Sequence, residues 1–87
     1  MPLKYTRNFL KNYTKRISPN AKLVKRFEER LHLFIKDPAN PVLKDHKLLG
    51  AKQNLRSFSV TGDIRVVYLR KGKTVYLIDI GTHAQVY

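Results

Sequence analysis

The sequence predicts an α+β fold in which a helical hairpin packs on a small, mainly antiparallel β-sheet. The first observation is that apolar residues recur every three or four positions through the first part of the chain. The second is that the last third holds runs rich in valine, isoleucine and tyrosine, separated by glycine-containing turns. Of the 87 residues, 43% are hydrophobic, so we expect residues 1–87 to form a single domain with its own core.

The first half is predicted to hold a short strand and two helices. The strand covers residues 3–6, "LKYT", and the first helix follows it up to about Arg16. Ser18 is expected to cap the second helix and Pro19 to begin it, because serine accepts hydrogen bonds from free N–H groups and proline suits the first helical position. The second helix should end before Pro38, since the residue preceding a proline avoids helical angles.

The second half is predicted to begin with a long loop and to continue as three strands. The loop, "DPANPVLKDHKLLGAKQN", contains two prolines and a glycine, and long loops in compact domains are often functional. The strand candidates are "LRSFSV", "DIRVVYLR" and "KTVYLIDI". The turns "TGD" and "RKGK" join them, and Gly62 and Gly72 are expected to supply positive φ angles there.

Composition limits the classes of function. Eighteen Lys and Arg residues against six Asp and Glu residues give a net charge of +12, which attracts polyanions. Nucleic acid is therefore the first candidate partner and an acidic protein the second, while a domain that is merely basic remains an alternative. The absence of cysteine excludes disulfides and thiolate chemistry and fits a cytoplasmic location. No apolar run is long enough for a membrane span, so no membrane partner is expected.

Histidine, arginine and aspartate stand at the predicted loops and strand ends. RNA cleavage through the 2′-OH needs a base, an acid for the departing 5′-oxygen and a cation for the transition state, which imidazole and guanidinium groups can supply. Asp63 and Arg65 are two residues apart, so on one strand they would face the same side. The three histidines lack metal-ligand spacing and no nucleotide-binding loop is present, so neither a metal nor a cofactor is expected.

Each of these residues also has a purely structural interpretation. His83 could be an exposed histidine in a turn, and His46 could serve to pack its loop. Asp63 and Arg65 could form a surface ion pair, which contributes about 0–1 kcal/mol. Tyr87 could close the core instead of contacting a ligand.

Three segments, "LKDHKLLG", "LRSFSVTGDIRVVY" and "IGTHAQVY", give the chain a family resemblance. Together they resemble the RelE/ParE superfamily of bacterial toxins from type II toxin–antitoxin pairs, and most closely its YafQ-like branch. The resemblance implies a RelE-like fold and a ribosome-dependent endoribonuclease that cuts mRNA. It also implies contacts with rRNA and neutralisation by a cognate antitoxin.

The resemblance assigns roles to individual residues. It implies His83 as general acid and either Asp63 or His46 as base. The full catalytic set would be His83, His46, Asp63, Arg65 and Tyr87, with Tyr87 stacking on a base or assisting proton transfer. The residues expected to bind RNA phosphate are Arg56, Arg65, Lys47 and Lys52.

Two positions depart from the YafQ-like pattern. Ser59 stands where that branch usually has a histidine, and Asp79 where it tends to have an arginine. Arg65 is then expected to supply the missing cation. The alternatives are a ParE-like inhibitor of DNA gyrase without nuclease chemistry, and a catalytically weak relative that binds RNA or its antitoxin.

Overall fold

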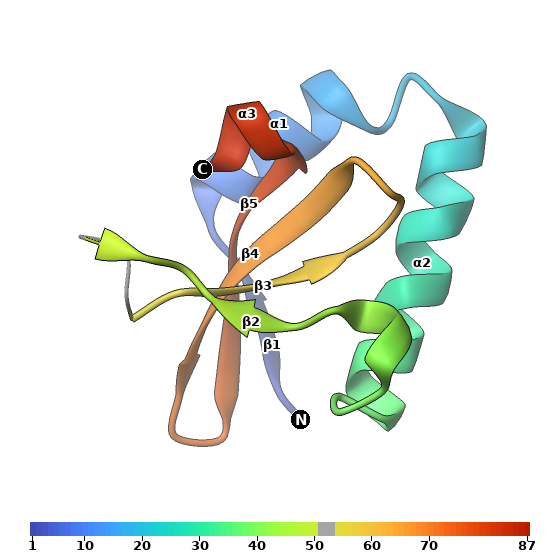
Figure 1. Cartoon of the computed structure of the whole chain (residues 1–87). Helices are drawn as coiled ribbons and strands as arrows, with labels where there is room; N and C mark the ends of the chain where they lie inside the picture. The colour runs from blue at the N-terminus through green and yellow to red at the C-terminus, as the bar shows by residue number, and fades with distance from the viewer. Residues whose placement is uncertain (51–53) are drawn as a thin grey trace.

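The computed structural model describes residues 1–50 and 54–87, and three helices lie against a curved sheet (Figure 1). A short 3₁₀ helix, η1, precedes the second strand. In chain order the elements are β1 (Leu3–Tyr5), α1 (Arg7–Arg16), α2 (Ala21–Lys36), η1 (Pro41–Leu43), β2 (His46–Lys47), β3 (Arg56–Ser59), β4 (Ile64–Lys71), β5 (Thr74–Thr82) and α3 (His83–Val86). This arrangement confirms the predicted α+β class.

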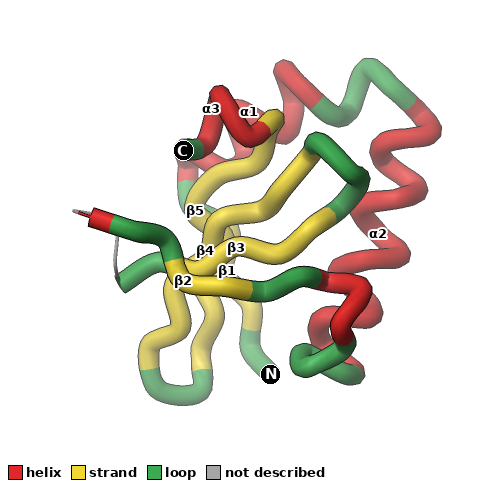
Figure 2. Tube along the Cα trace, viewed as in Figure 1, coloured by secondary structure: helices red, strands yellow, loops and turns green. Residues whose placement is uncertain are grey.

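The sheet has the strand order β1-β5-β4-β3-β2 (Figure 2). Its four later strands pair antiparallel, and β1 alone joins in parallel, with Leu3 opposite Val75. A register shift between Val67 and Tyr68 marks an irregularity in the β4–β5 ladder. The first and last thirds of the chain are therefore tied together through β1 and β5.

The main core lies between the sheet and the two long helices. Apolar faces of α1 and α2 pack on alternate side chains of β3, β4 and β5, as strand geometry requires. Phe34 stacks on Phe58 with ring centroids 4.6 Å apart, and Tyr68 meets Phe34 edge-on at 4.8 Å. These three side chains are at most 1% exposed, so α2 is fixed against the centre of the sheet.

A smaller apolar cluster forms on the opposite face of the sheet. Val66 belongs to the main core, so its neighbour Val67 points the other way, and there it packs with Leu48 and Val86. Leu48 directly follows β2 and Val86 belongs to α3. The same apolar patch of the sheet therefore packs against both the end of β2 and α3.

The helices show one correction to the sequence analysis. Both long helices end as predicted, but α2 is capped by Asn20 and not by Ser18. The Asn20 side chain accepts hydrogen bonds from the N–H groups of Lys22 and Leu23, while Ser18 Oγ donates to the carbonyl of Thr14 in the preceding turn. The start of α2 is thus shifted past Pro19, because asparagine completes the cap at that point.

The loops and turns show four further corrections. The long loop contains η1 and β2, and the chain ends in α3, a helix that the sequence analysis does not predict. Gly72 has the predicted positive φ of 61°, but Gly62 does not. Asp63 precedes β4, so it does not share a strand face with Arg65. Within the described ranges, no helix combines the length and the apolar character needed to cross a bilayer.

Candidate active site

A pocket of about 430 Å³ opens between β2 and α3, on the sheet face away from the long helices. It is lined by His46, Lys47, Leu48, Leu49, His83 and Tyr87. Two imidazoles, one tyrosine and one lysine therefore meet beside apolar surface. This combination of a polar end and an apolar wall suits a ligand such as a nucleotide, which has a charged phosphate and a flat base.

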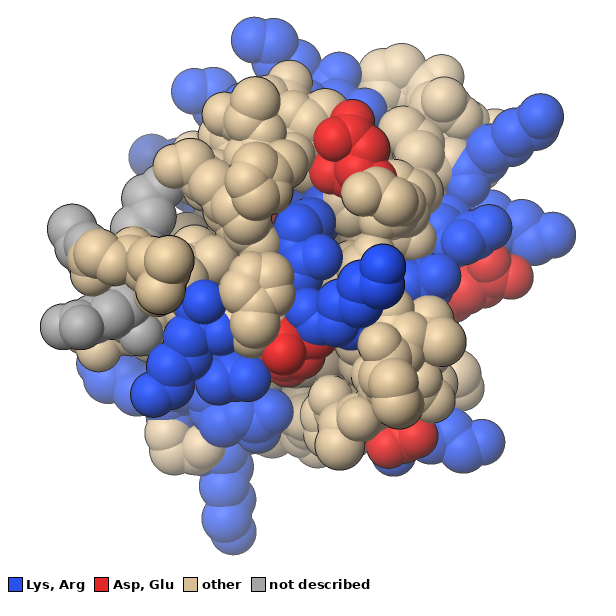
Figure 3. All heavy atoms as spheres, in the orientation of Figure 1, with Lys and Arg blue, Asp and Glu red and all other residues tan. Residues whose placement is uncertain are grey.

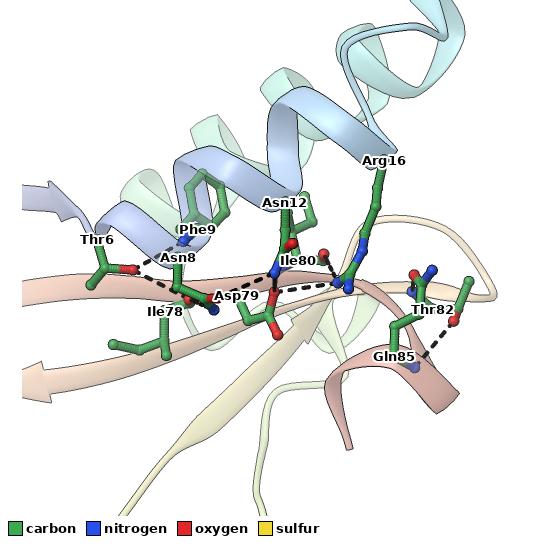
Figure 4. A network of polar contacts seen from close by, with 10 residues as sticks. All are labelled: Thr6, Asn8, Phe9, Asn12, Arg16, Ile78, Asp79, Ile80, Thr82 and Gln85. Atoms are coloured by element: carbon green, nitrogen blue, oxygen red, sulfur yellow. Dashed lines mark hydrogen bonds and ion pairs between the residues drawn. The ribbon is translucent and has the colours of Figure 1, made fainter.

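The helix α3 places the residues on one side of the pocket. Thr82 and Gln85 form a capping box: the Thr82 hydroxyl accepts from the Gln85 N–H, and the Gln85 side chain accepts from the Thr82 N–H. Figure 4 shows this cap beside Arg16, which reaches over from α1. A Cβ at Gly81 would lie 2.6 Å from Gln85 Oε1 and 2.7 Å from Arg16 Nη1, so a larger residue there would displace the ends of these two side chains.

The strand β2 places His46 on the other side of the pocket. The preceding residue, Asp45, accepts a 2.9 Å hydrogen bond from Arg56 Nε and another, very short one, from the hydroxyl of Tyr68. Burial, followed by the hydrogen bond to Asp45, raises the pKa of Tyr68 to about 12. The hydrogen bond to Asp45 also raises the pKa of Arg56. Asp45 thereby fixes the start of β2 to the middle of the sheet.

A closed set of hydrogen bonds joins five residues, two of which, His46 and Tyr87, line the pocket. Arg65 Nε donates to Ser57 Oγ at 2.9 Å, and Ser57 Oγ is in short contact with the Tyr87 hydroxyl. That hydroxyl lies 3.3 Å from His46 Nε2, and His46 Nδ1 lies 3.0 Å from the carbonyl oxygen of Lys44. Arg65 Nη2 closes the circuit by donating to the same Lys44 oxygen at 2.9 Å.

The donors and acceptors of this circuit have one consistent order. A carbonyl only accepts, so the 3.0 Å contact with Lys44 assigns the proton of His46 to Nδ1, in preference to the longer 3.4 Å contact in which Arg65 Nη2 would donate to Nδ1. His46 Nε2 then has a free lone pair and accepts from the Tyr87 hydroxyl. Ser57 accepts from Arg65 and donates to Tyr87. In this order His46 Nε2 is a proton acceptor. It contacts the pocket through the hydroxyl of Tyr87.

Tyr87 separates the two imidazoles of the pocket. Its ring meets His83 edge-on with centroids 4.1 Å apart, and meets His46 edge-on at 6.1 Å. Both histidines are exposed, so each can reach a bound molecule. The arrangement gives two separate proton-transfer groups on the two sides of one aromatic ring.

The other predicted site residues lie at different places. Lys47 lines the pocket, whereas Arg65 lies behind it with Nε and Nη2 bonded to protein groups. Asp63 lies in the exposed bend before β4 and is not among the lining residues. Arg56 is paired with Asp45 and borders a different hollow. Lys52 falls outside the described residues.

The two departures from the family pattern also lie outside the pocket lining. Ser59 is buried and donates to the carbonyl of Thr61 at 2.6 Å. Asp79 faces α1, where its Oδ1 accepts from Asn12 Nδ2 at 2.7 Å and lies 3.4 Å from Arg16 Nη1 (Figure 4). Asp79 thus anchors α1 to the sheet.

The sequence analysis did not find Ser57 or the Lys44 carbonyl. Ser57 is fully buried and links Arg65 to Tyr87, but a serine in a strand has no distinctive sequence signal. Lys44 acts through its backbone oxygen, which no side-chain pattern reveals; its positive φ of 48° accompanies that placement. In the part of the chain that the structure describes, no group of three or more potential ligands could hold a metal ion.

A small basic α+β domain that matches a toxin family model along its whole length belongs to the class of bacterial toxins of type II toxin–antitoxin systems. The family model for the bacterial toxin of the type II toxin–antitoxin system, YafQ, matches residues 1–87. The chain therefore belongs to the YafQ toxin family. A search of curated proteins found no match.

Solved structures show the same fold. YafQ in the DinJ–YafQ complex from E. coli is 23% identical, with a TM-score of 0.81 over 98% of this chain and 96% of that one. A copper-bound mutant toxin from Helicobacter pylori is 24% identical, with a TM-score of 0.77 over 100% and 99%. The YoeB/ParE toxin from Agrobacterium tumefaciens is 21% identical, with a TM-score of 0.76 over 95% and 99%.

Proposed function

We propose that this toxin is an endoribonuclease that cuts mRNA on the ribosome. The supporting observation is that His46 and His83 flank Tyr87 in one pocket whose lining also contains Lys47. Cleavage by the 2′-OH requires a base and an acid at different points of the scissile phosphate, and the pocket offers one imidazole for each. A toxin that acts on translating ribosomes acts in the cytoplasm, so this is the location that goes with the proposal.

The base in this proposal is His46, acting through Tyr87. The Tyr87 hydroxyl takes the proton of the substrate 2′-OH while its own proton passes to His46 Nε2. The 2′-oxygen then bonds to the adjacent phosphorus and a 2′,3′-cyclic phosphate forms. The carbonyl of Lys44 holds the Nδ1 proton of His46 and stabilises the imidazolium that results. Asp63 has no part in this step, because it does not line the pocket.

The acid is His83 in its protonated form. It gives a proton to the 5′-oxygen as the phosphorus–oxygen bond breaks, so the second product leaves with a 5′-OH. Lys47 faces the negative charge that builds up on the phosphate. Arg65 acts as a positioning residue, since its donors hold Ser57 and the Lys44 carbonyl in place.

The test is cleavage of mRNA during translation in vitro with single histidine variants. We expect His83→Ala and His46→Ala each to slow cleavage by about 10²- to 10⁴-fold, the usual contribution of a positioned acid or base. His32→Ala is the matched control, because His32 is exposed on α2 and away from the pocket. If both pocket variants cut as fast as the wild type, the assignment is wrong.

An antitoxin partner follows from the toxin family and from the DinJ–YafQ complex of E. coli. A net charge of +12 suits an acidic antitoxin segment. Growth arrest should disappear when a cognate antitoxin is co-expressed, and the arrested cells should contain truncated mRNA. Arrest with DNA damage and intact mRNA would instead indicate gyrase inhibition.

A further inference from the structure

A second hollow, of about 570 Å³, lies between α2 and the turn that joins β3 to β4. Four of its lining residues are cations: Lys22, Arg26, Arg30 and Lys44. In Figure 3, Lys and Arg side chains gather across the middle of the face, over the strands that lie beside α2 in Figure 1, with acidic side chains above and below them. No acidic residue is among its lining residues. We refer to this hollow as the α2 groove.

Three of the cations follow one another along the helix. Lys22, Arg26 and Arg30 are spaced four residues apart, so they form a row with a rise of about 6 Å from one to the next. Arg30 is held by hydrogen bonds from its Nη1 to the carbonyls of Val42 and Ser59, at 3.3 and 3.1 Å. A row of this kind suits a ligand that carries several negative charges at regular spacing better than a ligand with a single charge.

The charge of the row is only weakly compensated. Glu29 lies 3.7 Å from Arg26, but both side chains are about half exposed, at 60% and 48%, so the pair is weak. Burial and then the neighbouring Arg26 lower the pKa of Arg30, and the opposing effect of Glu29 is smaller than either. The groove is therefore poised to accept phosphate groups.

Lys44 connects the α2 groove with the active site. Lys44 is one of the residues that line the groove, and its backbone carbonyl accepts hydrogen bonds from His46 and Arg65. Lys44 therefore takes part both in the α2 groove and in the support of His46.

We propose that the α2 groove binds the sugar–phosphate backbone of the single-stranded RNA that continues from the active-site pocket. The proposal deepens the proposed function, since it names the path of the substrate. It assigns Lys22, Arg26 and Lys44 as backbone contacts, which give affinity without reading sequence. Short RNA that fills only the pocket gains nothing from them.

The test measures binding and not cleavage. Fluorescence polarisation is recorded with a labelled 2′-O-methyl decanucleotide, which cannot react, and with a trinucleotide of the same chemistry. The variant is Lys22→Gln with Arg26→Gln, two exposed helical positions where glutamine keeps helix propensity. The matched control is Lys71→Gln with Lys73→Gln at the β4–β5 turn, which removes the same charge elsewhere.

Loss of two phosphate contacts lowers the salt slope by about 1.4, at about 0.7 per single-strand phosphate. The ratio of wild-type to variant affinity for the decanucleotide should therefore change about sevenfold between about 50 and 200 mM salt. The trinucleotide and the control should show no such change. Equal slopes in variant and wild type, or an equal loss in the control, would overturn the proposal.

A third arm uses a labelled RNA hairpin without a single-stranded tail. If the groove variant weakens the hairpin and leaves the decanucleotide unchanged, the groove serves structured rRNA and the proposal is wrong. A protein that binds the decanucleotide through the groove but fails to cut ribosome-bound mRNA would refute the proposed function and leave the groove assignment standing. The two inferences can therefore fail separately.

Discussion

Replacing Tyr68 by phenylalanine tests how the start of β2 is fixed. Tyr68 is 1% exposed and donates its phenolic proton to Asp45, the residue before His46. The variant keeps the ring and loses one hydrogen bond to a carboxylate, which costs about 1.5–3 kcal/mol at neutral pH. The loss falls on the contact that joins the His46 segment to the sheet.

The effect must depend on pH in a defined direction. The pKa of Tyr68 rises from its ordinary value of 10.0 to about 12, so the folded state holds the phenolic proton more tightly than the unfolded state. The stabilisation is fully present below pH 10 and is lost as the pH rises through about 12. Roughly 1 kcal/mol is lost by pH 11 and roughly 2 kcal/mol by pH 12.

Urea unfolding followed by circular dichroism at pH 8 and pH 11 measures this effect. The difference in unfolding free energy between the wild type and Tyr68→Phe should shrink by roughly 1 kcal/mol between the two pH values. Tyr5→Phe is the control, because Tyr5 is 46% exposed. If the difference in unfolding free energy is the same at both pH values, the protonated phenol of Tyr68 does not stabilise the folded state.

Three further predictions concern the pocket and its support. Tyr87→Phe keeps the ring between the imidazoles but removes the hydroxyl that contacts His46, so mRNA cleavage should fall by about 10²-fold or more; an unchanged rate would leave only stacking as its role. Thr82→Ala removes the α3 cap, and thermal unfolding should show a loss of about 1 kcal/mol with reduced cleavage. Asp79→Ala should cost about 2–3 kcal/mol in urea unfolding, against less than about 0.5 for exposed Asp63→Ala; equal losses would contradict the anchoring role.

The long elements of the fold could be predicted because their patterns are strong. The apolar face of α2 and the valine-rich β4 and β5 extend over enough residues to show their periods. The strand β2 has only two residues, so no period exists to detect. The helix α3 did carry a signal: "THAQ" fits the capping-box pattern that Thr82 and Gln85 form.

Three of the side chains that line the candidate site could be predicted from the sequence, but the hydrogen bonds that hold them could not. The family motifs indicated His46, His83 and Tyr87, and the structure brings these three together. Arg65 was expected to face phosphate, but its donors are directed at Ser57 and at a backbone carbonyl. Such contacts depend on strand register and on the backbone path, which residue types alone do not determine.

The apolar patch under the pocket has a consequence for the evolution of this toxin. Val67 packs with Leu48, beside the His46 strand, and with Val86, within the His83 helix. A larger or smaller residue at this one position would alter the spacing of the two imidazoles while leaving both of them, and the main core, unchanged in sequence. A substitution at Val67, outside the pocket lining, would thus change the geometry of the pocket.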